Sequence, residues 1–520
     1  MNNRYKIFVC LLLLVGFSCD TDRVDSPPLG ATEASYFSNV IEFRNVMIGA
    51  YAKLYDYYFY NVPGTNWPNS LWLLPGDDIT ETNATRTAEE LFDGSMNSSN
   101  TRLEWMFDNI YEMIQKTSVI LDKVNTVDFS DYEGSDEIAF MEGEAFFLRA
   151  YSYYNLFNIF GNVPLVTERL GANNTNTPKS DKLEVLDQVI MDAQTAIGIL
   201  PESWDSGNRG RATKNSARGL LAKALVFRGN YTDNTADYTQ AISVFNTITA
   251  TLNTRYLDNF DAQFENNQES LFEVQAAAPT AINNIFLYND GAWRGVEDMS
   301  VFRGMMTPTG KGQVSNLANT RFLITNKLLN AFGSDPRISY FLRPDDNEEG
   351  RIFQKYTADE LDERLPPFQS SINNERVLRY GDLVLMIAEA ELKSGNPSAA
   401  IAHVNQIRTR ARDWGLTSGA GDGISPANYN TGETNNATIM QWIMDERYIE
   451  LAGEGQRWWD LKRWHEAGDL DLTGWTGSDE HFSTNLASSS QFDVNKHLLF
   501  PLPQTEIDRN EGILENNPGY

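Results

Sequence analysis

Apolar residues recur every three to four positions along several stretches of this chain, and two of those stretches resemble each other. Residues 219–230 (GLLAKALVFRGN) align with residues 385–396 (LMIAEAELKSGN) when Gly229 is set on Gly395, and a second apolar stretch follows each of them. A period of 3.6 residues is typical of an amphipathic helix, and a repeated pair of helices is typical of a helical-repeat protein. The pattern therefore predicts two antiparallel helical hairpins of the tetratricopeptide kind.

The connection within the second hairpin carries residues that commonly separate two helices. Gly395 is expected to end the first helix, Asn396 to cap the second, and Pro397 to lie in its first turn. The same periodicity predicts three more helices, at residues 105–124, 142–161 and 183–201, the last two forming a hairpin across a long loop. About four hairpins are enough to stack into a curved scaffold, so the expected fold class is mostly α.

Three stretches lack this periodicity and are rich in Asn, Gly, Pro, Asp and Thr: residues 56–104, 258–375 and 413–438. Long loops on a rigid helical scaffold are where binding faces are usually built. We therefore expect a single domain over residues 36–520, with its helical scaffold in residues 36–255 and 376–465. The irregular loops at 56–104 and 258–375, with minor β structure, are expected to carry the ligand-binding face.

The first residues predict export and a lipid anchor. Residues 1–18 begin with Arg4 and Lys6, continue with an apolar run, and precede Cys19. The run suits a signal-peptide core and is shorter than the roughly 20 residues that span a bilayer as a helix. The residues before Cys19 resemble a loose bacterial lipobox, which predicts removal of residues 1–18, lipid on Cys19 and a tether over residues 19–35. An ordinary secretory signal with an incidental cysteine is the alternative.

The composition is strongly acidic, with 42 basic and 71 acidic residues and a formal net charge of −29. Such a surface repels nucleic acids and anionic membranes, so no nucleic-acid partner is expected and a neutral ligand is favoured over a polyanion. Cys10 would leave with the signal, so the remaining cysteine has no partner for an internal disulfide. Aromatic residues make up 12% of the chain, which suits carbohydrate contact as well as core packing.

Catalytic motifs are poorly represented. The four histidines form no HExxH pair, no GxSxG nucleophile elbow is present, and residues 304–312 lack the full pattern of a phosphate-binding loop. Clustered metal ligands are missing as well, so neither a metal site nor a cofactor is expected. Carboxylates are too abundant for counting to exclude a glycosidase pair, whose test is a separation of about 5–10 Å.

Several segments in their order along the chain resemble the RagB/SusD family. They are EAFFLRAYSYYNLFNIFGNVPLV, RGRATKNSARGLLAKALV, ESLFEVQ, VLRYGDLVLMIAEAELKSGN, AIAHVNQIRTRAR, ERYIELAGEGQRWWDLKRW and the terminal LLFPLPQTEIDRN with NNPGY. The resemblance implies a non-catalytic surface lipoprotein of the Bacteroidetes outer membrane, facing the outside. It also implies tetratricopeptide-like helices with a less regular ligand-binding half, and a SusC-like TonB-dependent transporter as partner. The usual cargo of the family is an oligosaccharide, and some relatives carry peptides.

Paired tryptophans at residues 458 and 459 are the most sugar-like feature, yet their spacing favours packing. Leu451, Trp458 and Leu461 fall on one helical stripe, and large aromatic residues at helical spacing mostly serve cores. The charged residues around them offer enough opposite charges to pair with one another: Glu446, Arg447, Glu450, Arg457, Asp460 and Arg463. We expect buried tryptophans braced by a charge network.

Two polar loops fit a sugar site better. Exposed aromatic rings stack on the C–H faces of a pyranose, while Asn, Asp and Arg read its hydroxyl groups. The resemblance implies ligand contacts in a loop after the first helix and in the segment after ESLFEVQ. Those two places hold the candidate ligand residues Trp67, Asn66, Asn69, Asp77, Asp78, Tyr288, Asn289, Asp290, Trp293 and Arg294. Alternatively, some of these rings simply fix a loop to the scaffold; Trp72 is expected in the core, and Trp475 is a weaker third candidate.

The sequence therefore predicts a protein that binds a neutral oligosaccharide or polysaccharide, with a β-glucan of the laminarin type as the specific expectation. A surface glycoside hydrolase and a capture protein for peptides or another nutrient are the alternatives from other classes.

Overall fold

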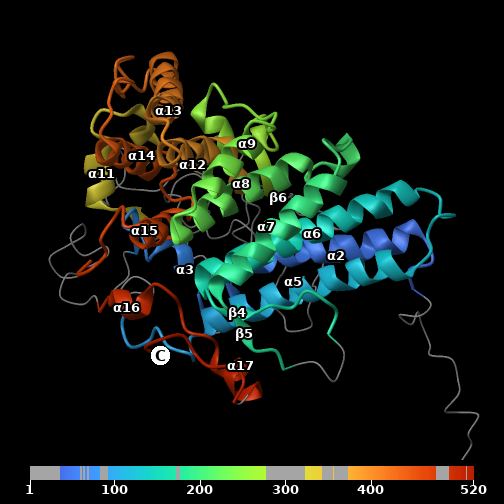
Figure 1. Ribbon diagram of the computed structural model, residues 1–520. Helices are drawn as coiled ribbons and strands as arrows, with labels where there is room; N and C mark the ends of the chain where they lie inside the picture. The colour runs from blue at the N-terminus through green and yellow to red at the C-terminus, as the bar shows by residue number, and fades with distance from the viewer. Residues whose placement is uncertain are drawn as a thin grey trace, which may run out of the picture.

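The computed structural model describes residues 36–58, 61–62, 65–66, 70–81, 92–170, 176–276, 322–341, 355, 373–475, 491–510 and 512–520. The expected signal peptide, lipidated Cys19 and tether lie outside these residues and stay predictions. Helices dominate the described part of the chain, as the apolar periodicity predicts (Figure 1).

The first half of the chain builds a row of long helices, each packed against the next one in sequence. This row consists of α2 (Val40–Tyr58), α5 (Thr101–Thr126), α6 (Ser135–Ile159), α7 (Lys182–Ile199), α8 (Lys214–Thr232) and α9 (Thr235–Phe245). Polar side chains set where several of these helices begin. Asn100 accepts hydrogen bonds from backbone N–H groups in the first turn of α5, and Asp181 and Glu184 form a capping box at α7.

A second group of helices continues this row. It consists of α12 (Tyr380–Lys393), α13 (Pro397–Ser418), α14 (Asn436–Glu450) and α15 (Arg457–Glu466). Helix α12 packs against both α8 and α9, so segments far apart in sequence form one continuous helical scaffold. The predicted mostly helical fold with tetratricopeptide-like hairpins is confirmed.

The predicted hairpins correspond to α6–α7, α8–α9 and α12–α13, with one difference from the expected turn. Gly395 follows α12 with φ +85° and Pro397 begins α13, but the Asn396 side chain donates to Glu391 Oε2 instead of capping α13. Gly229, which aligns with Gly395, lies inside α8, which continues to Thr232. It lies against the ring of Tyr238 on α9, where a larger residue would collide.

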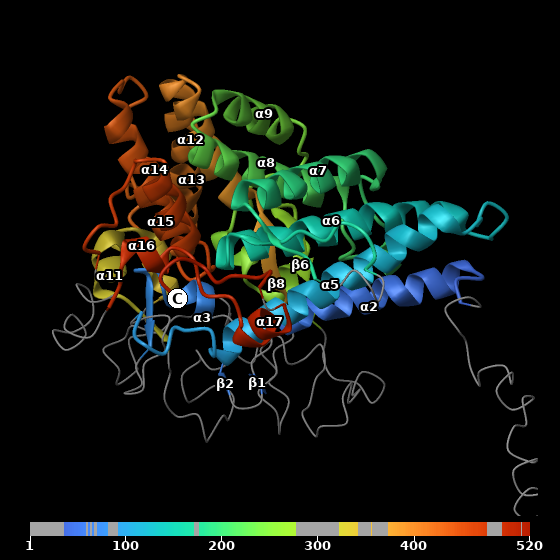
Figure 2. The same ribbon diagram turned by 60° about the horizontal axis from the view of Figure 1, so that its bottom comes forward.

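Short antiparallel pairs of strands connect the loops to this scaffold, which confirms the minor β structure. The pairs are β1 (Asn61–Val62) with β2 (Thr65–Asn66), β3 (Ile79–Glu81) with β7 (Phe322–Ile324), β4 (Val163–Pro164) with β5 (Lys179–Ser180), and β6 (Ser270–Val274) with β8 (Glu375–Arg379). Figure 2 shows β1 and β2 on the far side of the helices from α9. Short helical segments include α3 (Ser70–Leu73), η3 (Tyr256–Asn259), α11 (Asn326–Phe332), η6 (Pro336–Tyr340), α16 (Val494–His497) and α17 (Gln504–Arg509).

Two apolar cores lie beneath these elements. The larger one runs through the helical scaffold. The smaller one lies where the loops meet α14, and its members include Leu74, Ile79, Ile324, Tyr448 and Ala452. Among the helices that the structure describes, none is long and apolar enough to cross a membrane.

Candidate functional site

The pair β3–β7 joins the two loops in which the sequence predicts ligand contacts. Ile79 is paired with Ile324 and Thr80 with Leu323, in antiparallel register. Strand β3 lies within the early loop, and β7 lies within the later loop after the segment that follows ESLFEVQ. Backbone pairing therefore holds part of one predicted binding loop beside part of the other, although they are more than 200 residues apart in sequence.

Asp77 is fully buried at the entrance to β3, where it binds two cations. Its carboxylate accepts a hydrogen bond from Arg457 Nε at 2.5 Å and pairs with Lys327. Burial alone would raise the pKa of Asp77, but Arg457 and Lys327 hold it well below its usual range. Its backbone carbonyl accepts further hydrogen bonds from Tyr448 Oη and Thr325 Oγ1.

Asp78 is buried beside it and faces the turn between α14 and α15. Its Oδ2 accepts the backbone N–H of Gly453 at 2.8 Å, while Oδ1 finds no hydrogen-bond partner among the described residues. Burial raises the pKa of Asp78 to about 6. Neither Asp77 nor Asp78 is exposed, so the prediction that these two carboxylates contact ligand gives way to a structural role: they fix the base of the early loop to the scaffold.

The other predicted ligand residues have different outcomes. Asn66 lies in β2, where its backbone is paired with Asn61. The remaining members of the set, Trp67, Asn69, Tyr288, Asn289, Asp290, Trp293 and Arg294, lie outside the described residues and stay predictions. Trp72 packs against both apolar cores, as expected. The weaker candidate, Trp475, stacks on Trp458 with ring centroids 5.5 Å apart and is partly buried.

The tryptophans of α15 are buried, which confirms the packing interpretation. Trp458 and Trp464 have no exposed surface, and Trp459 is 7% exposed to solvent. Arg447, Asp460 and Arg463 pair with one another as predicted, at 2.8 Å for both pairs. The other three predicted partners, Glu446, Glu450 and Arg457, instead bind residues from other segments.

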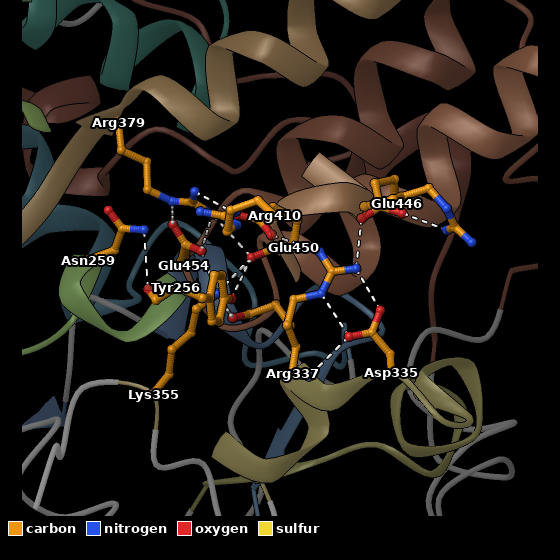
Figure 3. Close-up of polar contacts among 12 residues, drawn as sticks. Tyr256, Asn259, Asp335, Arg337, Lys355, Arg379, Arg410, Glu446, Glu450 and Glu454 are labelled. Carbon is orange, nitrogen blue, oxygen red and sulfur yellow. Dashed lines mark hydrogen bonds and ion pairs between the residues drawn. The ribbon is translucent and has the colours of Figure 1, made fainter. Parts of the chain in front are cut away.

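Those other segments form a second buried network, drawn in Figure 3. Arg337 of η6 donates to Glu446 and Glu450 of α14 at 2.7 Å each, and also to Asp335. Glu450 in addition accepts from Arg379 at the end of β8 and from Arg410 of α13. The sequence carries no local signal for the pairs that Arg337, Arg379 and Arg410 make with these two glutamates, because the members of those pairs are separated by 40 to 113 residues.

Two of the cavities on the described surface are bordered by helices of the scaffold. One, of about 510 Å³, lies between the end of α11, α13, α14 and the loop before α14, and its lining includes Ser334, Arg408, Tyr429 and Asp445. The other, of about 290 Å³, lies between α5 and the C-terminal segment and includes Asp108, Tyr111 and Glu506. Within the described ranges no group of His, Cys, Asp and Glu side chains gathers to hold a metal ion.

Comparison with known families covers both halves of the chain. Residues 342–520 match the family described as "SusD family", and residues 65–226 match one described as "Starch-binding associating with outer membrane". Together the two matches span more than half of the sequence. The protein belongs to the SusD/RagB family. Proteins of the SusD family are non-catalytic binding proteins, and the second family description associates them with the outer membrane.

Relatives of this SusD-family protein extend over its whole length. SusD-like protein P2 of Formosa agariphila is 25% identical over 561 residues, which cover 99% of this chain and 100% of the relative. A solved structure described as a laminarin-binding SusD-like protein has a TM-score of 0.71 at 22% identity, covering 93% of this chain and 100% of the other. Surface glycan-binding protein A from Bacteroides fluxus has a TM-score of 0.70 at 21% identity, covering 94% and 100%. These structures establish the SusD-like fold.

Proposed function

We propose that this SusD-family protein captures a neutral glycan at the cell surface and delivers it to a SusC-like TonB-dependent transporter. Of two solved structures with the same fold, one is described as laminarin binding and the other as a surface glycan-binding protein, which supports a glycan as ligand and a β-glucan as its class. The net charge of −29 favours an uncharged polysaccharide over an acidic one.

The observation that carries the proposal is the pairing of β3 with β7. It joins the base of the loop that contains Trp67 to the strand that follows the segment containing Trp293. Two aromatic residues supplied by neighbouring loops suit an oligosaccharide, whose successive rings need more than one stacking surface. Retention then depends on stacking and hydrogen bonds, and no covalent step is required.

Lipid on Cys19 would hold the protein on the outer membrane, facing outward, above its transporter. The family description of association with the outer membrane supports this location. Chemical cross-linking in native outer membranes is expected to recover a TonB-dependent transporter bound to this protein. Recovery of this protein only as an uncross-linked monomer would contradict the delivery step. Glycan capture would then be tested separately, by the binding measurements below.

Binding is tested by affinity electrophoresis of the chain without residues 1–19, in gels that contain laminarin or other neutral polysaccharides. Trp293→Ala is expected to abolish retardation by the bound glycan, and Trp67→Ala to weaken it, with little change in melting temperature. Trp204→Ala is the matched control, because this tryptophan lies outside both predicted loops. Its ring stacks on Arg211, with 3.8 Å between Arg211 Cζ and the ring centroid. This variant is expected to leave retardation unchanged.

The same samples separate the other functional classes. New reducing ends after incubation with glycan would establish a hydrolase and contradict a pure binding function. Binding to a peptide pool, with no polysaccharide retained, would assign a peptide cargo instead. Retardation that Trp293→Ala leaves intact would place the glycan site elsewhere on the protein.

A further inference from the structure

The turn between α14 and α15 carries the sequence Gly453-Glu454-Gly455, here called the Gly-Glu-Gly corner. It opens the tryptophan-rich stretch that first suggested sugar binding, and packing of the tryptophans does not explain it. Both glycines have positive φ, +69° for Gly453 and +73° for Gly455. Each of the three corner residues contacts a segment that enters or leaves a predicted ligand-binding loop.

The early loop contacts the corner on its two glycines. Gly453 donates its backbone N–H to Asp78, which precedes β3. Gly455 lies against Trp72 of α3, so closely that a Cβ at this position would be 2.4 Å from Trp72 Cδ1. The end of the early loop is thus fixed to the corner by a hydrogen bond and by a ring contact that admits only glycine.

The later loop contacts the corner through Lys355. This lysine is fully buried, and its ammonium group donates to the backbone carbonyls of Glu450 at 2.8 Å and Ala452 at 3.1 Å. It also pairs with the Glu454 carboxylate. Three aromatic rings lie near its ammonium group, with ring centroids at 4.6 Å for Phe260, 5.4 Å for Tyr256 and 6.0 Å for Phe341. Lys355 therefore occupies a complete cation site, built from the corner and its neighbours.

Glu454 also connects the corner to β8. Arg379, at the end of that strand, donates to Glu454 Oε2 at 2.6 Å and to Oε1 at 2.8 Å. Strand β8 is paired with β6, from which the chain continues toward Trp293. One carboxylate therefore binds a lysine from the later loop and an arginine from the strand that follows this loop.

We propose that the Gly-Glu-Gly corner is a positioning site for glycan binding, with Glu454 and Lys355 as positioning residues. Its role is to set the spacing between the early and the later binding loops, so that their ligand-contacting side chains face one glycan together. This inference rests on the proposed function. Neither residue contacts the glycan itself.

The chemistry of the corner favours positioning over simple stabilisation. Removing two charges from water costs most of what their attraction returns, so a buried ion pair adds little net stability compared with apolar residues of the same volume. What such a pair does supply is a fixed geometry, because each hydrogen bond is satisfied in one arrangement only. At the corner that geometry joins three segments: the end of the stretch before β3, the segment of Lys355 and the end of β8.

The experiment compares Lys355→Met and Glu454→Gln with a matched control, Arg149→Met. Arg149 forms a buried, two-bond ion pair with Asp192 between α6 and α7, at 2.7 Å for both bonds, and among the described residues its hydrogen bonds go to Asp192 and Thr167, outside both predicted loops. Hydrogen exchange is measured for peptides within residues 61–81 and 342–372 and for the scaffold helices. Affinity for laminarin is measured by calorimetry on the same samples.

Both corner variants are expected to exchange faster in the two loop segments, and to bind laminarin about 3- to 30-fold more weakly, with scaffold exchange unchanged. Arg149→Met is expected to show the opposite: faster exchange in α6 and α7, and unchanged affinity. Glu454→Gln keeps the shape of the side chain. If Lys355→Met fails to fold, the results for Glu454→Gln alone decide whether the corner positions the loops.

The outcomes distinguish this inference from the proposed function. If the unmodified protein binds no polysaccharide, glycan capture fails, and hydrogen exchange alone decides whether the corner fixes the loops. If the corner variants leave both loop exchange and affinity unchanged, or change exchange equally over the whole scaffold, the positioning role is overturned.

Discussion

Trp458 and Trp464 allow the contribution of a single buried hydrogen bond to be measured within one helix. Both side chains lie on α15 and have no exposed surface. The indole N–H of Trp464 donates to Glu389 Oε2 at 2.9 Å, whereas that of Trp458 has no acceptor among the described residues. We expect Trp464→Phe to destabilise the protein more than Trp458→Phe.

The size of the difference follows from the contacts. Each substitution removes the same atoms from a fully packed site, so the cost of the new cavity is similar in both. Losing a hydrogen bond to a charged group costs about 1.5–3 kcal/mol. Glu389 keeps its bond to Arg463 at 2.6 Å, which places the loss near the lower end of that range. Trp458→Phe also weakens the stack on Trp475, so the expected difference in unfolding free energy is about 1–2 kcal/mol.

Scanning calorimetry and urea unfolding measure this difference. A chain of about 500 residues has an unfolding entropy near 1 kcal/mol/K, so Trp464→Phe is expected to melt about 1–2 °C below Trp458→Phe. Glu389→Gln in both backgrounds serves as the control: it weakens the bonds from Arg463 and Asn230 equally in the two backgrounds, but it can weaken the bond from Trp464 only where that tryptophan is present. Equal destabilisation by the two tryptophan substitutions would refute the assignment of that bond as a stabilising contact.

Three further predictions concern the buried charges, pH and the corner. Arg337→Met leaves two buried glutamates without their shared partner and is expected to cost about 3–5 kcal/mol of unfolding free energy in urea; an unchanged midpoint would contradict this. Burial lowers the pKa of His497 from 6.5 to about 4 in the folded protein. As the pH falls from 6.5 to 4, the unfolded chain binds a proton at this histidine that the folded protein does not yet bind, so the unfolding free energy decreases over this range. His497→Phe should reduce that loss by about 1–2 kcal/mol, after allowance for solvent screening, and an identical pH profile would disprove the assignment. Gly455→Ala places a methyl group against Trp72 and is expected to lower both the melting temperature and the affinity for laminarin. The control is Gly468→Ala, because Gly468 has φ +75° but open space around it; this variant should lower the melting temperature alone.

Local pattern was sufficient for the helices and for part of their connections. The 3.6-residue period predicts α6, α7, α8, α12 and α13 because burial of one helical face is a property of consecutive residues. Gly395 and Pro397 mark a helix boundary for the same local reason. Gly229 aligns with Gly395 but lies inside its helix and admits the Tyr238 ring from the next helix, a contact that depends on how two helices pack.

The candidate site shows the limit of the same reasoning. An aspartate in a polar loop looks alike in sequence whether it faces solvent or a buried arginine, so Asp77 and Asp78 were assigned to the ligand. The structure instead buries both at the base of the loop, because Arg457 and Gly453, some 375 residues later, complete their contacts. The sequence does not predict the roles of residues such as Lys355 and Arg337, because most of the side chains that they bind are distant in sequence and come close only in the folded protein.

By itself, the sequence determined the helical class, the family and the fate of the paired tryptophans, since periodicity and motif order are linear properties. The tertiary structure decided which charges pair, that β3 joins β7, and that the Gly-Glu-Gly corner contacts residues of both predicted binding loops. The physical reason is that an ion pair or a strand pair is specified by distance in space, and a chain of this length offers each buried charge many possible partners in sequence. Packing of the helices selects one of them.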